Sequence, residues 1–392
     1  MMFASRVPAD LLPNCLSTAV ATHRASRRPL LDLTVTNPTL TGIPYPPDIL
    51  TPLADVRALQ YTPEPFGGAA AREAVARDYA RRGISVALQQ VVLTASTSEA
   101  YSLLFKLLCD PAHDDVLVPV PSYPLFDHLT RLDGVGARPY VLEYHGRWQI
   151  DEQSVDTAWT SSIQAVLAVT PNNPTGSSLA AHEMAFLTDR CAERRAALIL
   201  DEVFADYPLA PPDAARPHSG AHGTPDALTF RLGGLSKSAG LPQVKLGWIA
   251  VDGPPPLVDS ALQRLELICD TYLSVSTPVQ VAAPELIARG AAVRAAIQER
   301  IRMNHAHLRA AVASHPSVDL LHADGGWAAV VRIPASRAEE EVVLDLLERH
   351  DTLVHPGFFF DFPREAFLVL SLLPDPAVFR EGVARILEHA GA

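Results

Sequence analysis

The sequence is poor in cysteine, and this shortage narrows the kind of protein it can be. Four cysteines occur in 392 residues, none pairs with another at CxxC spacing, and no histidine cluster completes a metal-ligand set. Unpaired cysteines are typical of a reducing compartment. We therefore predict free thiols, no metal site and a cytoplasmic location. The four residues are Cys15, Cys109, Cys191 and Cys269.

Long apolar runs and an excess of basic charge are also missing. No stretch of about 18 apolar residues is present to span a bilayer, and the N-terminal MMFASRVPADLLP lacks the basic segment and apolar run of a secretory signal. Acidic residues outnumber basic ones, 44 to 32, for a net charge of −12. We expect no membrane partner and no nucleic-acid partner, because the latter needs clustered Lys and Arg.

Hydrophobic residues are plentiful, at 48% of the chain, so a large buried core is expected. Short apolar runs alternate with amphipathic helical stretches, a pattern that predicts an α/β unit with a mostly parallel sheet. The runs of strand length are residues 90–94, 115–120, 165–170, 197–201, 228–232 and 246–251.

The pattern changes near residue 275. A long helical stretch at 278–314 is followed by two strand-like and two helical segments, which predicts a smaller α+β domain. Residues 30–35 are strand-like but have no local partner, so the first 40 residues are expected to pack on that domain. The predicted division is an N-terminal arm with part of the small domain (1–45), a large domain (46–275) and a small C-terminal domain (276–392).

Two polar segments follow strands of the larger unit and offer hydrogen-bond donors. TASTSEA, at residues 94–100, contains Ser96 and Thr97 between a strand and a helix, where backbone N–H groups favour an anion. TPNNPTG, at 170–176, brings Asn173 to a strand end, where ligands bind in α/β sheets. When each segment is taken alone, an ordinary helix cap is the alternative explanation for the first and an ordinary tight turn for the second.

Two further segments carry charge. DEVFADY begins with Asp201 at the end of a buried strand, where an ionised carboxylate needs a partner such as a protonated pyridine nitrogen. GGLSKSAGLPQVKLGW, at 233–248, sets Lys237 among small and apolar residues, which lowers the pKa of an amine and makes it more nucleophilic. Lys245 follows in the same segment and is able to neutralise a phosphate. A helix cap and a solvated lysine are the alternatives.

The order TASTSEA, PSYP, NNPTG, DEVFADY and SKSAGLPQVKLGW resembles the class I/II aminotransferases, the aspartate-aminotransferase-like group of fold-type I pyridoxal phosphate enzymes. The resemblance extends over about residues 30–390. It implies a large domain with a mostly parallel, mixed, seven-stranded sheet flanked by helices, together with a smaller α+β domain.

The resemblance also implies roles for the residues. Lys237 would carry pyridoxal 5'-phosphate as a Schiff base, the aldimine, and move the proton between Cα and C4' of the substrate–cofactor adduct. Asp201 would pair with the pyridinium nitrogen, and Asn173 would donate to the 3' oxygen.

Five more positions match residues that hold the cofactor in the family. Tyr123, in PSYP, would stack on the ring, while Ser96 and Thr97 would bind the phosphate. Lys245 stands where the family usually has an arginine for the phosphate. Tyr61 of the partner subunit would reach the phosphate too, which implies a homodimer with shared active sites.

The chain departs from the family pattern at several positions. Phe204 stands where a tyrosine is frequent, Gly234 where a serine is frequent, and Asn37 where a glycine is frequent. The largest departure is Val369, at the position of the arginine that clamps the substrate carboxylate, because valine cannot form bidentate pairs. Arg147 and Arg364 are the cations considered as replacements, and a solvated surface arginine is the alternative for each.

The predicted function is a transaminase that moves an amino group between an amino donor and an oxo acid or aldehyde. The cofactor-binding residues are shared by other pyridoxal phosphate reactions, so a β-elimination or C–S lyase, or a decarboxylase, stays open. A non-catalytic cofactor-binding module is the third hypothesis.

Overall fold

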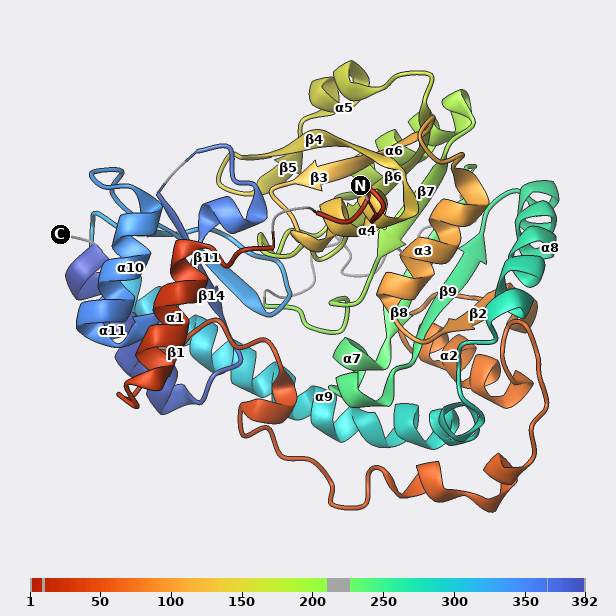
Figure 1. Ribbon diagram of the computed structural model, residues 1–392, viewed down its shortest axis with the longest axis horizontal. Coiled ribbons are helices and arrows are strands. Elements are labelled where there is room, and N and C mark those ends of the chain that lie inside the picture. Colours follow the sequence, from red (N-terminus) through yellow and green to blue (C-terminus); the bar gives the residue numbers. More distant parts are fainter. Residues whose placement is uncertain (1, 9–10, 210–225, 365, 391–392) are drawn as a thin grey trace.

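The computed structural model describes residues 2–8, 11–209, 226–364 and 366–390. A large sheet covered by helices occupies one part of the molecule and a smaller sheet with three helices lies beside it (Figure 1). The long helix α9 (Thr277–Val312) runs beneath both parts and contacts α2 (Ala69–Arg81) and α11 (Pro376–Ala390).

The large sheet has eight strands within the described residues, in the order β2-β9-β8-β7-β6-β3-β4-β5. The run from β8 to β4 is parallel, and the pairs β2–β9, β9–β8 and β4–β5 are antiparallel. The strands are β2 (Val91–Thr94), β3 (Asp115–Val120), β4 (Gly136–Tyr144), β5 (Trp148–Ile150), β6 (Ile163–Val169), β7 (Ala197–Asp201), β8 (Thr229–Gly234) and β9 (Gly247–Asp252).

The expected seven strands are therefore present, and β5 adds an eighth at the edge. The neighbouring strands β4 and β5 are missed by a search for apolar runs for a physical reason. Three residues in the first half of β4 are exposed, so its sequence, GARPYVLEY, has no continuous apolar stretch. By contrast β7 is buried at every position, as a central parallel strand is expected to be.

Helices cover both faces of this sheet. They are α2, α3 (Thr97–Leu108), α4 (Leu125–Asp133), α5 (Glu152–Ala158), α6 (Ala181–Arg194), α7 (Leu235–Ser238) and α8 (Pro255–Tyr272). Short 3-10 helices occur at η1 (Pro38–Leu40), η2 (Thr51–Ala54), η3 (Val56–Leu59), η4 (Leu88–Gln90), η5 (Pro242–Val244) and η6 (Gly357–Phe360). None of the helices in the described ranges combines the length and apolar composition that crossing a bilayer requires.

The smaller sheet is antiparallel, in the order β10-β11-β14-β13. Its strands are β10 (Asp319–Leu320), β11 (Ala328–Arg332), β13 (His355–Pro356) and β14 (Phe367–Ser371). Helix α1 (Cys15–Ala25) lies beside α10 (Glu339–His350), and β1 (Leu31–Asp32) pairs in parallel with β12 (Thr352–Leu353) (Figure 1). The N-terminal segment is thus held by elements more than 300 residues later in the chain.

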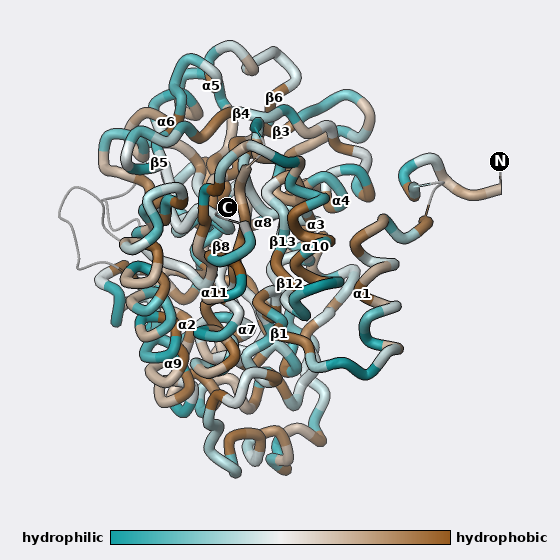
Figure 2. Tube along the Cα trace, turned by 90° about the vertical axis from the view of Figure 1, so that its left-hand side faces the viewer, coloured by the Kyte–Doolittle hydropathy of each residue, from teal (hydrophilic) through white to brown (hydrophobic). Residues whose placement is uncertain are grey.

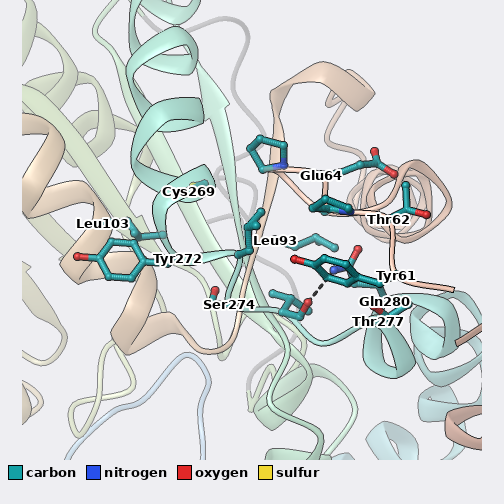
Figure 3. Close-up of a pocket in the computed structure, with 15 residues that line it drawn as sticks. Tyr61, Thr62, Glu64, Leu93, Leu103, Cys269, Tyr272, Ser274, Thr277 and Gln280 are labelled. Carbon is teal, nitrogen blue, oxygen red and sulfur yellow. Dashed lines mark hydrogen bonds between the residues drawn. The ribbon is translucent and has the colours of Figure 1, made fainter. Parts of the chain in front are cut away.

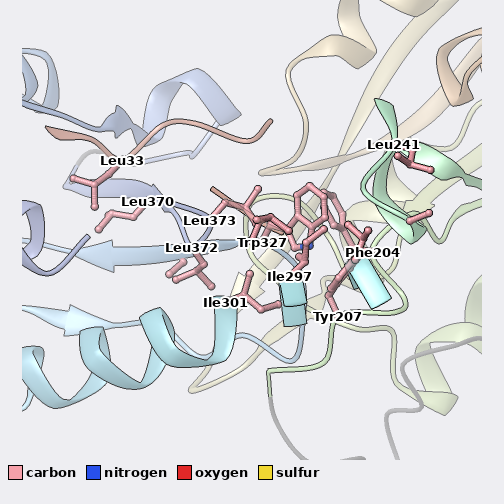
Figure 4. Packing of buried hydrophobic residues seen from close by; sticks show 14 of the residues in the cluster. Leu33, Phe204, Tyr207, Leu241, Ile297, Ile301, Trp327, Leu370, Leu372 and Leu373 are labelled. Carbon is pink, nitrogen blue, oxygen red and sulfur yellow. The ribbon is translucent and has the colours of Figure 1, made fainter. Parts of the chain in front are cut away.

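Buried side chains join the two sheets into one core. Figure 2 shows hydrophobic residues along the inner strands and hydrophilic ones on outer turns. In Figure 4, Trp327 lies between leucines of the smaller sheet and the pair Phe204 and Tyr207. The Trp327 ring meets both of them edge to face, at centroid distances of 5.5 Å and 5.0 Å. Packing of this kind connects the smaller sheet rigidly to the loop after β7.

Candidate active site

A cavity of about 470 Å³ opens at the carboxyl ends of β6, β7 and β8. Its walls come from the large sheet, from β11, β13 and β14 of the smaller sheet, and from the segment after β1. Seven of the eight predicted site residues line it: Ser96, Thr97, Tyr123, Asn173, Asp201, Lys237 and Lys245. The carboxyl edge of a parallel sheet is where ligands bind in α/β folds.

Lys237 lies on the short helix α7, which follows β8 directly. Its Nζ is 4.9 Å from the centre of the Trp327 ring and 5.7 Å from that of Phe204. Burial lowers the pKa of this amine to about 8, although the negative charge of Asp201 acts in the opposite direction. The neutral, nucleophilic fraction of this amine near pH 7 is therefore much larger than in an ordinary lysine.

Asp201 ends β7 and is 8% exposed. Its Oδ1 accepts a hydrogen bond from the backbone N–H of Val203 at 3.1 Å, and its Oδ2 accepts one from the Tyr101 hydroxyl at 2.9 Å. Burial raises the pKa of this carboxyl to about 6, against the effect of the two donors. Within the described residues the carboxylate forms no ion pair, so a cation bound in the cavity would complete it.

Tyr101 was not among the predicted site residues. It is buried on α3, five residues beyond Ser96, and it directly follows the TASTSEA segment. A buried tyrosine hydroxyl needs a hydrogen-bond partner. This requirement is the signal in the sequence that points to Tyr101. The partner lies 100 residues away in the chain, which only the fold reveals.

The second acid of DEVFADY has a structural role. Glu202 is buried and accepts from Arg231 at 2.7 Å and from Arg82 at 3.4 Å. These two guanidinium groups offset a charge that would raise the pKa of the adjacent Asp201 further.

Of the two asparagines of TPNNPTG, the first has a structural role and the second lines the cavity. The Asn172 side chain is buried, donates to the Pro121 carbonyl and to Thr175 Oγ1, and accepts from Ser122 Oγ. It holds the turn to the loop that carries Tyr123. Asn173, the next residue, lines the cavity.

The start of α3 and Lys245 form the end of the cavity suited to an anion. Ser96 caps α3, its Oγ accepting from the N–H of Glu99 at 3.1 Å, and Thr97 is the first helical residue. Gly247 allows β9 to pass close by, because a Cβ there would lie 3.0 Å from the Thr97 nitrogen. Lys245 has a φ of 59°, in the left-handed region. Gly234 also lines this cavity.

Tyr61 is the predicted residue that this chain does not bring to the cavity. It is 70% exposed and lines a separate, smaller pocket, where Thr62 and Glu64 lie beside it and Tyr272 lies opposite (Figure 3).

The position expected to clamp a carboxylate is apolar. Val369 is 3% exposed and lines the cavity. Neither proposed replacement is close: Arg147 lies 3.7 Å from Asp324, and Arg364 lines a different pocket with Tyr144 and Phe362. Asn37 is taken up in capping η1, where its Oδ1 accepts from the N–H of Thr39. Among the described cavity-lining residues, the basic side chains are Lys237, Lys245 and His355.

These features fit pyridoxal phosphate. A buried acid without a cation suits a protonated ring nitrogen, a lysine of lowered pKa suits an aldehyde, and a helix N-terminus beside Lys245 suits a phosphate. The fold and the cavity together define a fold-type I pyridoxal phosphate enzyme.

Comparison with known proteins identifies the family. The model for aminotransferase class I and II matches residues 33–386, so the chain belongs to that family. Its members use pyridoxal 5'-phosphate, and this chain is a pyridoxal phosphate-dependent aminotransferase.

Relatives with assigned activities are distant in sequence. Glutamate-pyruvate aminotransferase AlaA of Haemophilus influenzae is 24% identical over 91% of this chain and 89% of its own length. Alanine aminotransferase of Mycobacterium bovis is 27% identical over 73% of this chain and 67% of its own length. The structure of alanine aminotransferase from Pyrococcus furiosus superposes with a TM-score of 0.85 and 21% identity over 98% of both chains. At that identity the structural likeness establishes the fold.

Proposed function

We propose that Lys237 is the residue that binds pyridoxal phosphate covalently, and that the site transfers an amino group between a small amino donor and an oxo acid or aldehyde. The observation that carries this proposal is that Lys237 and Asp201, at the ends of neighbouring parallel strands, face the same cavity. When bound, the cofactor supplies an electron sink that makes the substrate Cα–H acidic.

Asp201 holds a proton at the ring nitrogen, since its buried carboxylate would otherwise lack a cation. The Val203 N–H and the Tyr101 hydroxyl fix the orientation of that carboxylate. With the cofactor bound, the Lys237 amine would be placed to take the proton from the substrate Cα and to hold it for return. Its lowered pKa suits both halves of this transfer near neutral pH.

The remaining residues bind and orient the cofactor. Asn173 would donate to the 3' oxygen, and Tyr123 would cover one face of the ring. Ser96, Thr97 and Lys245 bind the phosphate through helix N–H groups, hydroxyls and a point charge. Phe204, which also lines the cavity, offers no hydroxyl to the 3' oxygen, so Asn173 carries that contact.

We also propose a homodimer in which Tyr61 of the partner subunit completes the phosphate site. Support comes from large exposed apolar side chains on η3, just before Tyr61, and on α8, whose last residue lines the same pocket as Tyr61. They are Val56, Leu59, Leu267 and Tyr272. Exposed apolar groups of this size are typical of protein interfaces. Leu59→Glu with Leu267→Glu is expected to give monomers with weakened cofactor binding, measured by light scattering and fluorescence titration. Leu132→Glu, at another exposed leucine, is the matched control; dimers that persist in the double variant would refute this interface.

Two further proposals concern organisation and location. The domain boundaries are set near residues 45 and 275, supported by the pairing of β1 with β12 and by the start of α9 at Thr277. A cytoplasmic location is supported by the four free cysteines.

A panel of amino donors tests the reaction. In single-turnover mode, a competent donor is expected to convert the absorbance of the bound pyridoxal form to that of the pyridoxamine form, and Lys237→Ala should abolish this conversion. Release of pyruvate, ammonia or carbon dioxide without the pyridoxamine form would point to lyase or decarboxylase chemistry. No change with any donor would refute the proposal.

A further inference from the structure

His355 and Val369 are direct partners across the antiparallel pair β13–β14. Side chains that face each other in such a pair project from the same face of the sheet, with Cβ atoms roughly 5 Å apart. Both residues line the cavity. An imidazole therefore stands beside the place where Val369 leaves the substrate without a guanidinium group.

One ring nitrogen of His355 lacks a hydrogen-bond partner in the part of the chain that the structure describes. Its Nδ1 is buried and has no hydrogen-bond partner among the described residues. The ring lies 5.9 Å from both the Phe359 and the Phe360 rings, measured between centroids. A buried polar group without a partner is unfavourable, because it has lost its hydrogen bonds to water. A ligand that bonds to this imidazole would recover part of that loss.

The charges around His355 come from three directions. Asp32 on β1 favours its protonated form, whereas burial lowers the pKa of the imidazole and is the larger effect. Glu339 on α10 has its carboxylate occupied by the N–H groups of Phe358 and Phe367. Lys237, which also lines the cavity, is cationic or neutral according to pH. The Glu339 carboxylate is therefore engaged by backbone donors, and Asp32 is the acid that acts on His355.

Apart from the expected cofactor-binding residues, most of the cavity lining is apolar or aromatic. Thr34 and Thr36 also line the cavity, and the segment that carries them is held in place because Ser371 Oγ donates to the Val35 carbonyl at 2.6 Å. The apolar and aromatic lining residues are Phe126, Val169, Val203, Phe204, Trp327, Ala328, Phe359, Phe360 and Val369.

We propose that His355 binds the substrate carboxylate in place of the arginine that is absent at position 369, and that the substrates are amino and oxo acids with apolar or aromatic side chains. This inference rests on the proposed function for the reaction itself. An imidazole offers single hydrogen bonds where a guanidinium offers a fork, so carboxylate binding is weaker and pH-dependent.

Ligand binding tests the proposal without turnover. Calorimetry of the pyridoxal phosphate-loaded enzyme with 3-phenylpropanoate and with 3-phenylpropan-1-ol separates the carboxylate from the apolar contacts. His355→Ala is expected to lower the affinity for 3-phenylpropanoate about tenfold and the affinity for the alcohol less than twofold. His355→Gln keeps a donor, so its affinity for 3-phenylpropanoate should fall between those of the native enzyme and His355→Ala. His113→Ala, on an exposed loop, should bind both ligands as the native enzyme does. Equal losses for both ligands, or none, would overturn the proposal.

Two further measurements sharpen the result. The dissociation constant of 3-phenylpropanoate should rise with pH in the native enzyme, as the imidazole loses its proton, and should rise less in His355→Ala, where Lys237 and Asp201 are the cavity groups that still titrate. Adding Val369→Arg to His355→Ala should restore carboxylate binding. Loss of binding in that double variant, with the fold intact by circular dichroism, would contradict a carboxylate site at this pair of strands.

The outcome is distinguishable from failure of the proposed reaction. If 3-phenylpropanoate binding depends on His355 while no amino donor converts the cofactor, the reaction is wrong and the binding site stands. If L-phenylalanine and other donors convert the cofactor regardless of His355, this inference alone fails. A preference for 2-phenylethylamine over L-phenylalanine would also overturn it, because the amine has no carboxylate.

Discussion

The hydroxyl of Tyr101 donates to Oδ2 of Asp201 across 2.9 Å, and both side chains are buried. The bond joins the first helix after the anion-binding turn to the end of the central strand β7. It leaves the carboxylate in one orientation, with Oδ1 already accepting from Val203. The acid expected to meet the cofactor ring is thereby oriented before the cofactor arrives.

Tyr101→Phe removes this orienting donor while keeping the ring. We expect the affinity for pyridoxal phosphate to fall about tenfold, because a hydrogen bond to a charged group contributes about 1.5 kcal/mol. Fluorescence titration of the apoprotein measures it. Tyr140→Phe is the matched control, since its buried hydroxyl donates to the Leu167 carbonyl elsewhere in the same sheet. Equal affinity losses in the two variants would mean that Tyr101 acts only through general stability.

Asp201→Asn should stabilise the cofactor-free protein at neutral pH. Burial raises the pKa of Asp201 from its ordinary 3.8 to about 6. Between these values the folded state binds more protons than the unfolded state, so stability falls as pH rises through this window. The variant lacks this loss and should be more stable at pH 7.5, by on the order of 3 kcal/mol at most. Urea unfolding at pH 7.5 and pH 4 checks it; an advantage that persists at pH 4 would contradict the titration argument.

Capture of pyridoxal phosphate by the apoprotein should accelerate with pH. The neutral amine is the nucleophile, and burial lowers the Lys237 pKa to about 8. The rate of the absorbance change after mixing should therefore rise from pH 6.5 and level off above pH 9, with a midpoint near 8. Borohydride reduction should then fix the cofactor to native protein and leave Lys237→Ala unmodified by mass. A pH-independent rate would refute the assigned pKa.

Lys245→Gly and Lys245→Ala separate charge from backbone strain. Both remove the ammonium group expected at the phosphate, so both should weaken pyridoxal phosphate binding to the same degree. Only glycine adopts the φ of 59° without strain. The apoprotein of Lys245→Gly should thus be about 1 kcal/mol more stable than that of Lys245→Ala. Thermal unfolding of the two apoproteins gives the comparison, and equal stabilities would show that this backbone is unstrained.

Much of the larger sheet and its site is predictable from local patterns. Strands such as β6 and β7 are apolar throughout because both faces are covered. Polar residues that end such strands share one edge of the sheet, which is why Asn173, Asp201 and Lys237 were expected together before their geometry was known. The hairpin β4–β5 is not predictable in this way, because exposed residues interrupt its apolar pattern.

The residues around the substrate, by contrast, are not predictable from local patterns. The candidates Arg147 and Arg364 were named for their nearness in sequence to site segments, and the fold directs neither to the cavity. The place of His355 in the cavity is not predictable from the sequence, because it depends on strand register. A shift of one residue would turn its side chain to the other face of the sheet.

The sequence by itself determined the α/β pattern, the ordered cofactor-binding segments and the lack of an arginine at position 369, because each depends on residue type and short-range spacing. Only the tertiary structure decided that Tyr101 supports Asp201, that Ser371 holds the segment of Thr34 and Thr36 at the cavity, and that His355 stands beside Val369. Those contacts join residues from 14 to 336 positions apart. Packing and strand register bring such residues together, and neither leaves a local mark in the chain.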